Sequence, residues 1–359
     1  MIPGVIVFII KDSHPSGVCR EVLGLTQNLR TVGYRVHVAL FRGHGLWTTA
    51  LSMAGATVTA YGPSSQSEED ASCAIVQEII KRSADAVIAY VDSIPLFERL
   101  ASICERPRII KAEGRKIMEG RPNRIALYRR FGAIFDAVVV TSRSMLNKFV
   151  ELSLPTDRCE LIPTAVDTSY FRPSEDRSAV KASIGVGVDQ HVCLNVARIT
   201  RHKQAELFAA VAEGVLPRFA NSRFVWVGGQ NDCSYSVPSA LTDGDVEFVG
   251  VRGDPRPFYQ CADVFLMTSI DESAPNTLLE AMSSGVPVVT TRSYSTISDV
   301  IDERSGFVVP DVACATEAVI ELLRNVSLRK SVGASARRRA IEEFGLEQRV
   351  GRFRALLER

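Results

Sequence analysis

The 359-residue chain lacks several patterns that would define its class at once. No apolar run approaches the length of a membrane span. The net charge is only +1, which gives no overall reason to expect nucleic acid as a partner. The eight cysteines form no C-x-x-C pair, so neither a zinc site nor a disulfide framework is indicated. Dispersed thiols fit a reducing compartment, so we expect a cytoplasmic protein. Within the cytoplasm, one possible location is the inner face of the membrane.

Other absences are local. The apolar segment Val5–Ile10 is neither preceded by a basic region nor followed by a small-residue cleavage site, so we interpret it as a first buried strand and not as an export signal. No G-x-G-x-x-G fingerprint is present, and GVGVD at 185–189 precedes a strand instead of following one. The histidines have no ligand spacing, and DGD at 243–245 is best interpreted as a surface turn. We expect no protein-bound metal and no cofactor.

The chain does contain a regular alternation of short β-branched runs with helical patterns. Strands are predicted at 5–10, 35–41, 57–61, 86–91, 108–112 and 137–142, then at 192–199, 224–229, 246–251, 263–269 and 306–310. Helices lie between them, and three more end the chain at about 313–325, 327–343 and 346–359. Strict alternation of strand and helix predicts α/β domains with doubly wound parallel sheets.

The alternation breaks at the polar segment 167–176, so we predict two Rossmann-like domains, 1–168 and 169–359. We expect them to face each other across a cleft, with the last helix packing back on the first domain. Ligands of open α/β sheets bind at the carboxyl ends of the strands, which would line that cleft.

The stretch 269–291 is a strand exit, a polar loop, a short helix and a new strand. Glu272 in the loop and Glu280 in the helix are eight positions apart. A carboxylate at such a place can accept hydrogen bonds from a ribose or sugar diol, and the helix N-terminus favours an anion such as a diphosphate. The alternative is that Glu272 caps the helix and Glu280 lies on a solvated face.

A second candidate segment is VARITRHKQAEL, in which Arg198 ends a strand and Lys203 lies near a helix start. Two cations at this position could grip phosphates and offset charge that develops on a leaving diphosphate. A third is the turn after the first strand, where Gly17 opens a helix and permits close approach of the backbone to a ligand. Each alone is equally compatible with an ordinary loop.

Residues 106–130 carry a local charge excess of +7. Within them and just beyond lies an apolar stripe of Leu127, Tyr128, Phe131, Ile134 and Phe135, flanked by arginines. Such a segment fits peripheral contact with an anionic membrane or an anionic acceptor. A core-facing stripe with a solvated basic face is the alternative.

Taken together, these elements resemble the family-4 retaining glycosyltransferases of the GT-B fold. The resemblance covers nearly the whole chain and is carried above all by ESAPNTLLEAMSSGVPVV, with VVVTS, FVWVGG, VEFVGV and SGFVVP in the expected order. It implies that a sugar moves from a UDP- or GDP-sugar to an acceptor hydroxyl without a metal. The product would belong to a glycan, a glycolipid or a glycosylated metabolite.

The resemblance also implies roles for individual residues. Glu280 would hold the ribose hydroxyls, Glu272 the transferred sugar, and Arg198 and Lys203 the diphosphate. The segment with Ser273, Asn276, Thr277 and Leu278 would face the diphosphate or the sugar, and Gly17 would approach it from the first domain.

The chain departs from the family pattern at two places. A His-Gly pair near the reacting sugar is replaced by Glu113-Gly114, which puts a carboxylate where an imidazole is common and makes Glu113 a catalytic candidate. An Asn-Gly pair between the domains is replaced by Thr164-Ala165.

Alternative functions are a nucleotide-sugar epimerase or hydrolase, and a non-catalytic nucleotide-sugar-binding protein. The acceptor, the base and the sugar are not defined by the sequence.

Overall fold

A computed structural model describes residues 4–14, 16–62, 67–113, 122–229, 244–270, 272, 275–291 and 297–359. The chain divides into two compact units, which are described separately below. Unit 1 comprises Met1–Thr164 and Glu347–Arg359, and unit 2 comprises Ala165–Leu346. No helix in these described ranges is long and apolar enough to cross a membrane.

Unit 1 is built on a seven-stranded sheet of order β3-β2-β1-β4-β5-β6-β7, in which every neighbouring pair is parallel. The strands are β1 Val5–Ile10, β2 Arg35–Leu40, β3 Thr57–Ala60, β4 Ala86–Ala89, β5 Arg108–Ala112, β6 Ala137–Val140 and β7 Cys159–Leu161. All residues of β1 are buried, which confirms the interpretation of the apolar N-terminus as a core strand.

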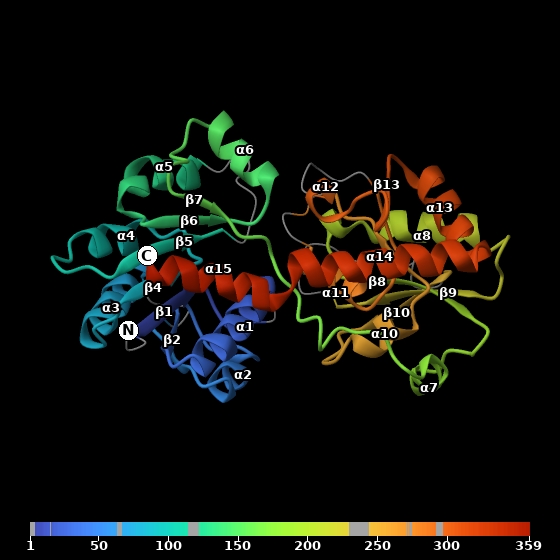
Figure 1. Cartoon of the computed structure of the whole chain (residues 1–359), viewed down its shortest axis with the longest axis horizontal. Helices are drawn as coiled ribbons and strands as arrows, with labels where there is room; N and C mark the ends of the chain where they lie inside the picture. Colours follow the sequence, from blue (N-terminus) through green and yellow to red (C-terminus); the bar gives the residue numbers. More distant parts are fainter. Residues whose placement is uncertain are drawn as a thin grey trace. The chain divides into compact units, whose positions relative to one another are not determined.

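The helices of unit 1 connect these strands, and several begin at a serine that caps them. They are α1 Gly17–Thr31, α2 Thr48–Met53, α3 Glu68–Lys81, α4 Ile94–Ala101, α5 Pro122–Phe131 with the 3₁₀ turn Gly132–Ile134, and α6 Arg143–Glu151. Ser16, Ser67, Ser93 and Ser142 each accept a hydrogen bond from a first-turn amide. The last helix, α15 Leu346–Glu358, returns to unit 1 (Figure 1), where Arg349 donates to Glu21 of α1.

Unit 2 contains a six-stranded parallel sheet of order β10-β9-β8-β11-β12-β13. Its strands are β8 His191–Val196, β9 Ser222–Val227, β10 Val246–Gly250, β11 Val264–Met267, β12 Val288–Thr291 and β13 Gly306–Val309. Its helices are α7 Arg177–Ser183, α8 Ala205–Val215, α10 Arg256–Cys261, α11 Asn276–Ser283, α12 Ile297–Val300, α13 Val312–Arg324 and α14 Val326–Phe344, with the 3₁₀ turn Arg201–Lys203.

The two parallel sheets and the alternation of strand and helix confirm the predicted fold class. The predicted strands and the three terminal helices appear within a few residues of their expected bounds. The periodicity did not identify several short elements: α2, α7, α12 and β7 have six, seven, four and three residues. A segment of one or two turns is too brief to establish a hydrophobic period.

Candidate active site

In unit 2 the strand order reverses between β8 and β11. From β8 the chain moves outward through β9 and β10, whereas β11, β12 and β13 extend to the other side. A crevice opens at the carboxyl ends of two such strands because their connections leave in opposite directions. Most of the predicted site residues lie in the loops that follow Val196 of β8 and Met267 of β11, and in the helix α11 that follows the second loop.

These two loops are joined by hydrogen bonds. The hydroxyl of Thr268, just after β11, donates to the carbonyl oxygens of Lys203 and Gln204, both at 3.0 Å. The amide of Ile270 donates to the carbonyl of His202 at 2.8 Å. Gln204 adopts a left-handed conformation, with φ 52°, which ends the 3₁₀ turn and starts α8. The backbone that carries Lys203 is therefore held against the end of β11.

The ammonium group of Lys203 contacts the carboxylate of Glu272. The side chains are 16% and 14% exposed, so the ion pair is largely shielded from solvent. Two residues that the sequence analysis placed in separate motifs are thus neighbours. A cation beside an acid, at the point where the strand order reverses, can bind a ligand that carries both phosphate and hydroxyl groups.

Arg198 lies on the same loop, and its side chain is exposed to solvent. The backbone around it is fixed by β9, because Ala197 and Ile199 donate to the carbonyls of Val227 and Gly229. Gly228 has φ 141°, and a Cβ atom there would lie 1.9 Å from the carbonyl oxygen of Ala197. Only glycine permits this close approach, which explains the first glycine of the pair in FVWVGG.

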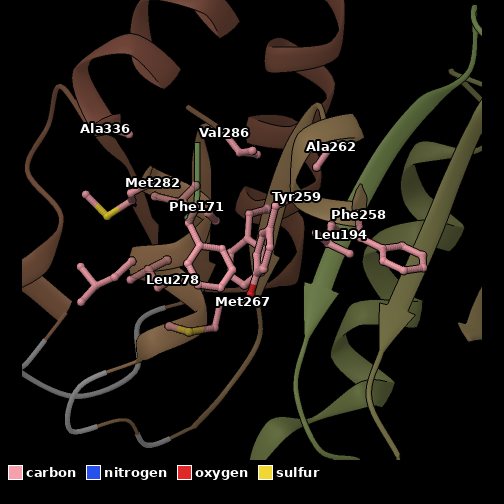
Figure 2. Packing of buried hydrophobic residues seen from close by; sticks show 14 of the residues in the cluster. Phe171, Leu194, Phe258, Tyr259, Ala262, Met267, Leu278, Met282, Val286 and Ala336 are labelled. Atoms are coloured by element: carbon pink, nitrogen blue, oxygen red, sulfur yellow. The ribbon is translucent and has the colours of Figure 1, made fainter. Parts of the chain in front are cut away.

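Glu280 lies in α11 and is 2% exposed. Its carboxylate accepts a hydrogen bond of 2.7 Å from the hydroxyl of Tyr259. Tyr259 is itself fully buried in the core of unit 2, where its ring packs against Phe171 at a centroid distance of 5.7 Å (Figure 2). The alternative that Glu280 lies on a solvated helix face is therefore wrong. Tyr259 could not be predicted as a site residue, because its distance from Glu280 in the sequence matches no known motif.

Helix α11 starts at the N-cap Pro275, which makes no side-chain cap hydrogen bond, and α8 likewise lacks one at Gln204. The amide of Leu278 already donates to the carbonyl of Pro275 at 3.0 Å. The first-turn amides of Asn276 and Thr277 are thus better placed than that of Leu278 to face an anion. Ser273, also predicted to line this site, is outside the described residues.

Two predicted features belong to unit 1. Gly17 is the exposed first residue of α1, after the Ser16 cap, and follows the carboxyl end of β1, where the strand order of this sheet reverses. Glu113 follows β5 and is 1% exposed; Gly114 is outside the described residues.

The carboxylate of Glu113 is part of a buried ionic network. It contacts the hydroxyl of Tyr128, pairs with Lys111 at 2.7 Å and lies 3.2 Å from the guanidinium of Arg124. Lys111 and Arg124 also pair with Asp92. Burial raises the pKa of the Asp92 carboxyl, but the two cations outweigh burial, so this pKa is lowered. Burial and the adjacent Glu113 raise the pKa of Tyr128. The carboxylate of Glu113 thus pairs with groups of its own unit, and its catalytic role stays a prediction.

The apolar stripe of 106–135 faces the core of unit 1. Leu127, Tyr128, Phe131 and Phe135 are buried and Ile134 is partly buried, so the core-facing alternative holds for this stripe. These buried side chains are not available for apolar contact with a membrane, and peripheral contact through the basic residues of 106–130 stays a prediction. Arg121 and the rest of 114–121 are outside the described residues.

Within the described part of the chain, no group of three or more His, Cys, Asp and Glu side chains could hold a metal ion. The described residues of the DGD segment, Gly244 and Asp245, form an exposed bend before β10. Asp243 is outside the described residues.

Several known proteins share this architecture. Residues 190–325 match the family model of the glycosyl transferases group 1. A UDP-glucose complex of HepE from Anabaena superposes with a TM-score of 0.83 at 18% identity, covering 99% of both chains. WaaG, a glycosyltransferase involved in lipopolysaccharide biosynthesis, gives a TM-score of 0.72 at 17% identity, over 96% of this chain and 98% of WaaG. The fold is therefore that of the GT-B glycosyltransferases.

A curated glycosyltransferase is also similar in sequence. The GDP-mannose-dependent alpha-(1-6)-phosphatidylinositol monomannoside mannosyltransferase of Mycolicibacterium smegmatis is 29% identical over 244 residues, which cover 64% of either chain. The match thus spans just under two thirds of that relative's length. Over residues 190–325 the chain is similar to the group 1 glycosyl transferases, in agreement with the resemblance drawn from the sequence.

Proposed function

We propose that the protein is a glycosyltransferase that moves a sugar from a nucleoside-diphosphate sugar to an acceptor hydroxyl with retention of configuration. The observation that carries this proposal is the Lys203–Glu272 ion pair at the strand switch of unit 2. The pair places a phosphate-binding cation and a hydroxyl-binding acid side by side, which suits the diphosphate and the sugar of one donor.

The remaining groups of unit 2 are assigned from the same geometry. Glu280, oriented by Tyr259, accepts hydrogen bonds from the ribose hydroxyls. Arg198 and the first-turn amides of α11 bind the diphosphate, and Lys203 stabilises the charge that develops on it as the sugar leaves. The acceptor hydroxyl attacks from the face of the departing diphosphate, whose oxygen takes the proton.

The donor is a UDP- or GDP-sugar, and cations and helix amides replace a metal. HepE has been crystallised with UDP-glucose, and the mycobacterial relative is named as GDP-mannose-dependent; these two names support the two bases. The product is part of a glycan, a glycolipid or a glycosylated metabolite, made in the cytoplasm. Turnover that is unchanged by a chelator supports this account, and turnover that requires an added divalent cation contradicts it.

Analysis of the products tests the reaction itself. The protein is incubated with UDP- and GDP-sugars and a panel of acceptors, and the anomeric coupling of new glycosides is measured by NMR. We expect a glycoside with the anomeric configuration of the donor. Free sugar or epimerised donor in the absence of an acceptor would identify a hydrolase or an epimerase, and donor binding without turnover a non-catalytic binder.

A further inference from the structure

Unit 1 has a strand reversal of its own, at the carboxyl ends of β1 and β4. From β1 the chain moves outward through β2 and β3, whereas the strands from β4 to β7 extend to the other side. The rule that places a crevice in unit 2 therefore places one here as well. The loop after β4 presents Asp92, which is exposed between the buried residues Val91 and Ser93.

The backbone around Asp92 is held at both ends. The amide of Tyr90 donates to the carbonyl of Ile9 in β1 at 2.9 Å. The hydroxyl of Ser93 caps α4 and accepts a hydrogen bond of 3.3 Å from the amide of Leu96. The carboxylate of Asp92 thus has a fixed place at the reversal.

Asp92 differs in exposure from the other charged members of the buried ionic network. The side chains of Lys111 and Glu113 are fully buried, and that of Arg124 is 5% exposed. The side chain of Asp92 is 33% exposed, although it pairs with the same two cations as Glu113. An acid that served only to neutralise these cations would be buried like Glu113. Asp92 is therefore the acid of this network that can meet a ligand.

The two carboxylate oxygens of Asp92 are not equivalent. Oδ2 receives Nε and Nη2 of Arg124, at 3.0 and 2.9 Å, whereas Oδ1 lies 3.2 Å from Nζ of Lys111. A carboxylate oxygen has two lone pairs, so Oδ1 can accept a further hydrogen bond. The lowered pKa of Asp92 keeps the carboxyl ionised at neutral pH, so that it accepts hydrogen bonds and does not donate them.

The charges at this place are balanced. Two cations face two acids within the network, and Lys11 and Asp12 in the loop after β1 have opposite charges. The loop after β8 in unit 2, by contrast, presents the exposed cation Arg198. This edge of unit 1 therefore suits a neutral group that donates hydrogen bonds better than it suits a phosphate.

We propose that unit 1 binds the acceptor at this strand reversal as a neutral polyol, such as a sugar residue, with Oδ1 of Asp92 accepting a hydrogen bond from one of its hydroxyls. The inference rests on the proposed function, which supplies the reaction that consumes the acceptor. Binding of the polyol itself requires no donor.

The test is saturation-transfer NMR on the full chain without donor, with glucose, galactose, mannose and glycerol, each compared with its monophosphate. We expect at least one neutral polyol to bind, and its phosphate to bind no more tightly. In Asp92→Asn the amide oxygen stays beside Arg124 and the NH₂ group replaces Oδ1, so binding should be about tenfold weaker. Asp92→Glu keeps the charge that the two cations need but moves the carboxylate by one methylene group, and should also bind more weakly.

The matched control is Asp136→Asn. Asp136 is also an acid of unit 1 that pairs with an arginine, and its side chain is 26% exposed, but it precedes β6 at the opposite edge of the sheet. The control should bind the polyol like the parent protein. Thermal unfolding verifies that each variant is folded, and the Tm shift with nucleotides tests unit 2 separately. No binding of any neutral polyol, tighter binding of a phosphate, or equal losses in the variants at 92 and 136 would overturn the proposal.

Discussion

Lys203 and Glu272 are 69 residues apart in the sequence, and their charged groups are in contact. The contact exists because β8 and β11 are adjacent parallel strands and because Thr268 binds the carbonyl of Lys203. A parallel sheet brings distant loops together at its carboxyl edge, and the strand switch leaves room between them. The proposed donor site is built on this relationship.

Replacement of Lys203 by methionine should lower kcat with a smaller effect on the KM of the donor. Lys203 is assigned to charge that develops on the leaving diphosphate, and loss of one such group typically lowers turnover by about 10²–10³-fold. Steady-state kinetics with the preferred donor measures the effect, and Lys203→Arg, which keeps the charge, is the control. Full activity of the methionine variant would remove Lys203 from the mechanism.

Replacement of Glu280 by glutamine should raise the Kd of the nucleotide by roughly 10–100-fold, because hydrogen bonds to a charged acceptor are among the stronger ones. Tyr259→Phe removes only the bond that orients Glu280, so its effect should be smaller and in the same direction. Titration calorimetry with the free nucleotide measures both. If the tyrosine variant binds more weakly than the glutamate variant, the division between a binding residue and a positioning residue is wrong.

Glu113→Gln should lower the stability of unit 1 by about 3 kcal/mol, because it leaves the charges of Lys111 and Arg124 incompletely compensated inside the unit. The control is Glu98→Gln, which breaks an exposed pair with Arg130 and should change stability by no more than about 0.5 kcal/mol. Urea unfolding measures both. A variant at 113 with parental stability and lost turnover would instead place this carboxylate at the reacting atoms.

His37 should make stability depend on pH. It is buried between the hydroxyls of Thr57 and Tyr61, and burial, with the charge of Arg82, lowers its pKa to about 4. In the unfolded chain the pKa is about 6.5. Between these values only the unfolded state binds the proton, so the free energy of unfolding decreases as the pH falls through this window, by up to about 3 kcal/mol.

The variant His37→Gln should lack this part of the pH dependence, and His44→Gln, at an exposed position, should retain it. Thermal unfolding at a series of pH values separates the two. Identical pH profiles of the His37 variant and the parent protein would contradict the assignment.

The sequence was sufficient for the fold because β-branched runs and helical periods alternate over nearly its whole length. It also placed Glu272 and Lys203 in loops after strands, where a parallel sheet gathers them. It could not show the hydrogen bond from Tyr259 to Glu280, because that contact depends on where the six-residue helix α10 places Tyr259 in the folded unit. Nor could it show that Glu113 and Arg124 are buried together, since charged residues are ordinarily exposed.

The central claim is that unit 2 binds a nucleoside-diphosphate sugar at Lys203, Glu272 and Glu280. Its most direct test is a thermal-shift measurement of the parent protein and of Glu280→Ala with UDP, GDP, ADP and their sugars. We predict that one nucleotide and its sugars raise the Tm of the parent protein and have much less effect on the variant. An unchanged Tm with every nucleotide, or equal shifts in both proteins, would contradict the claim.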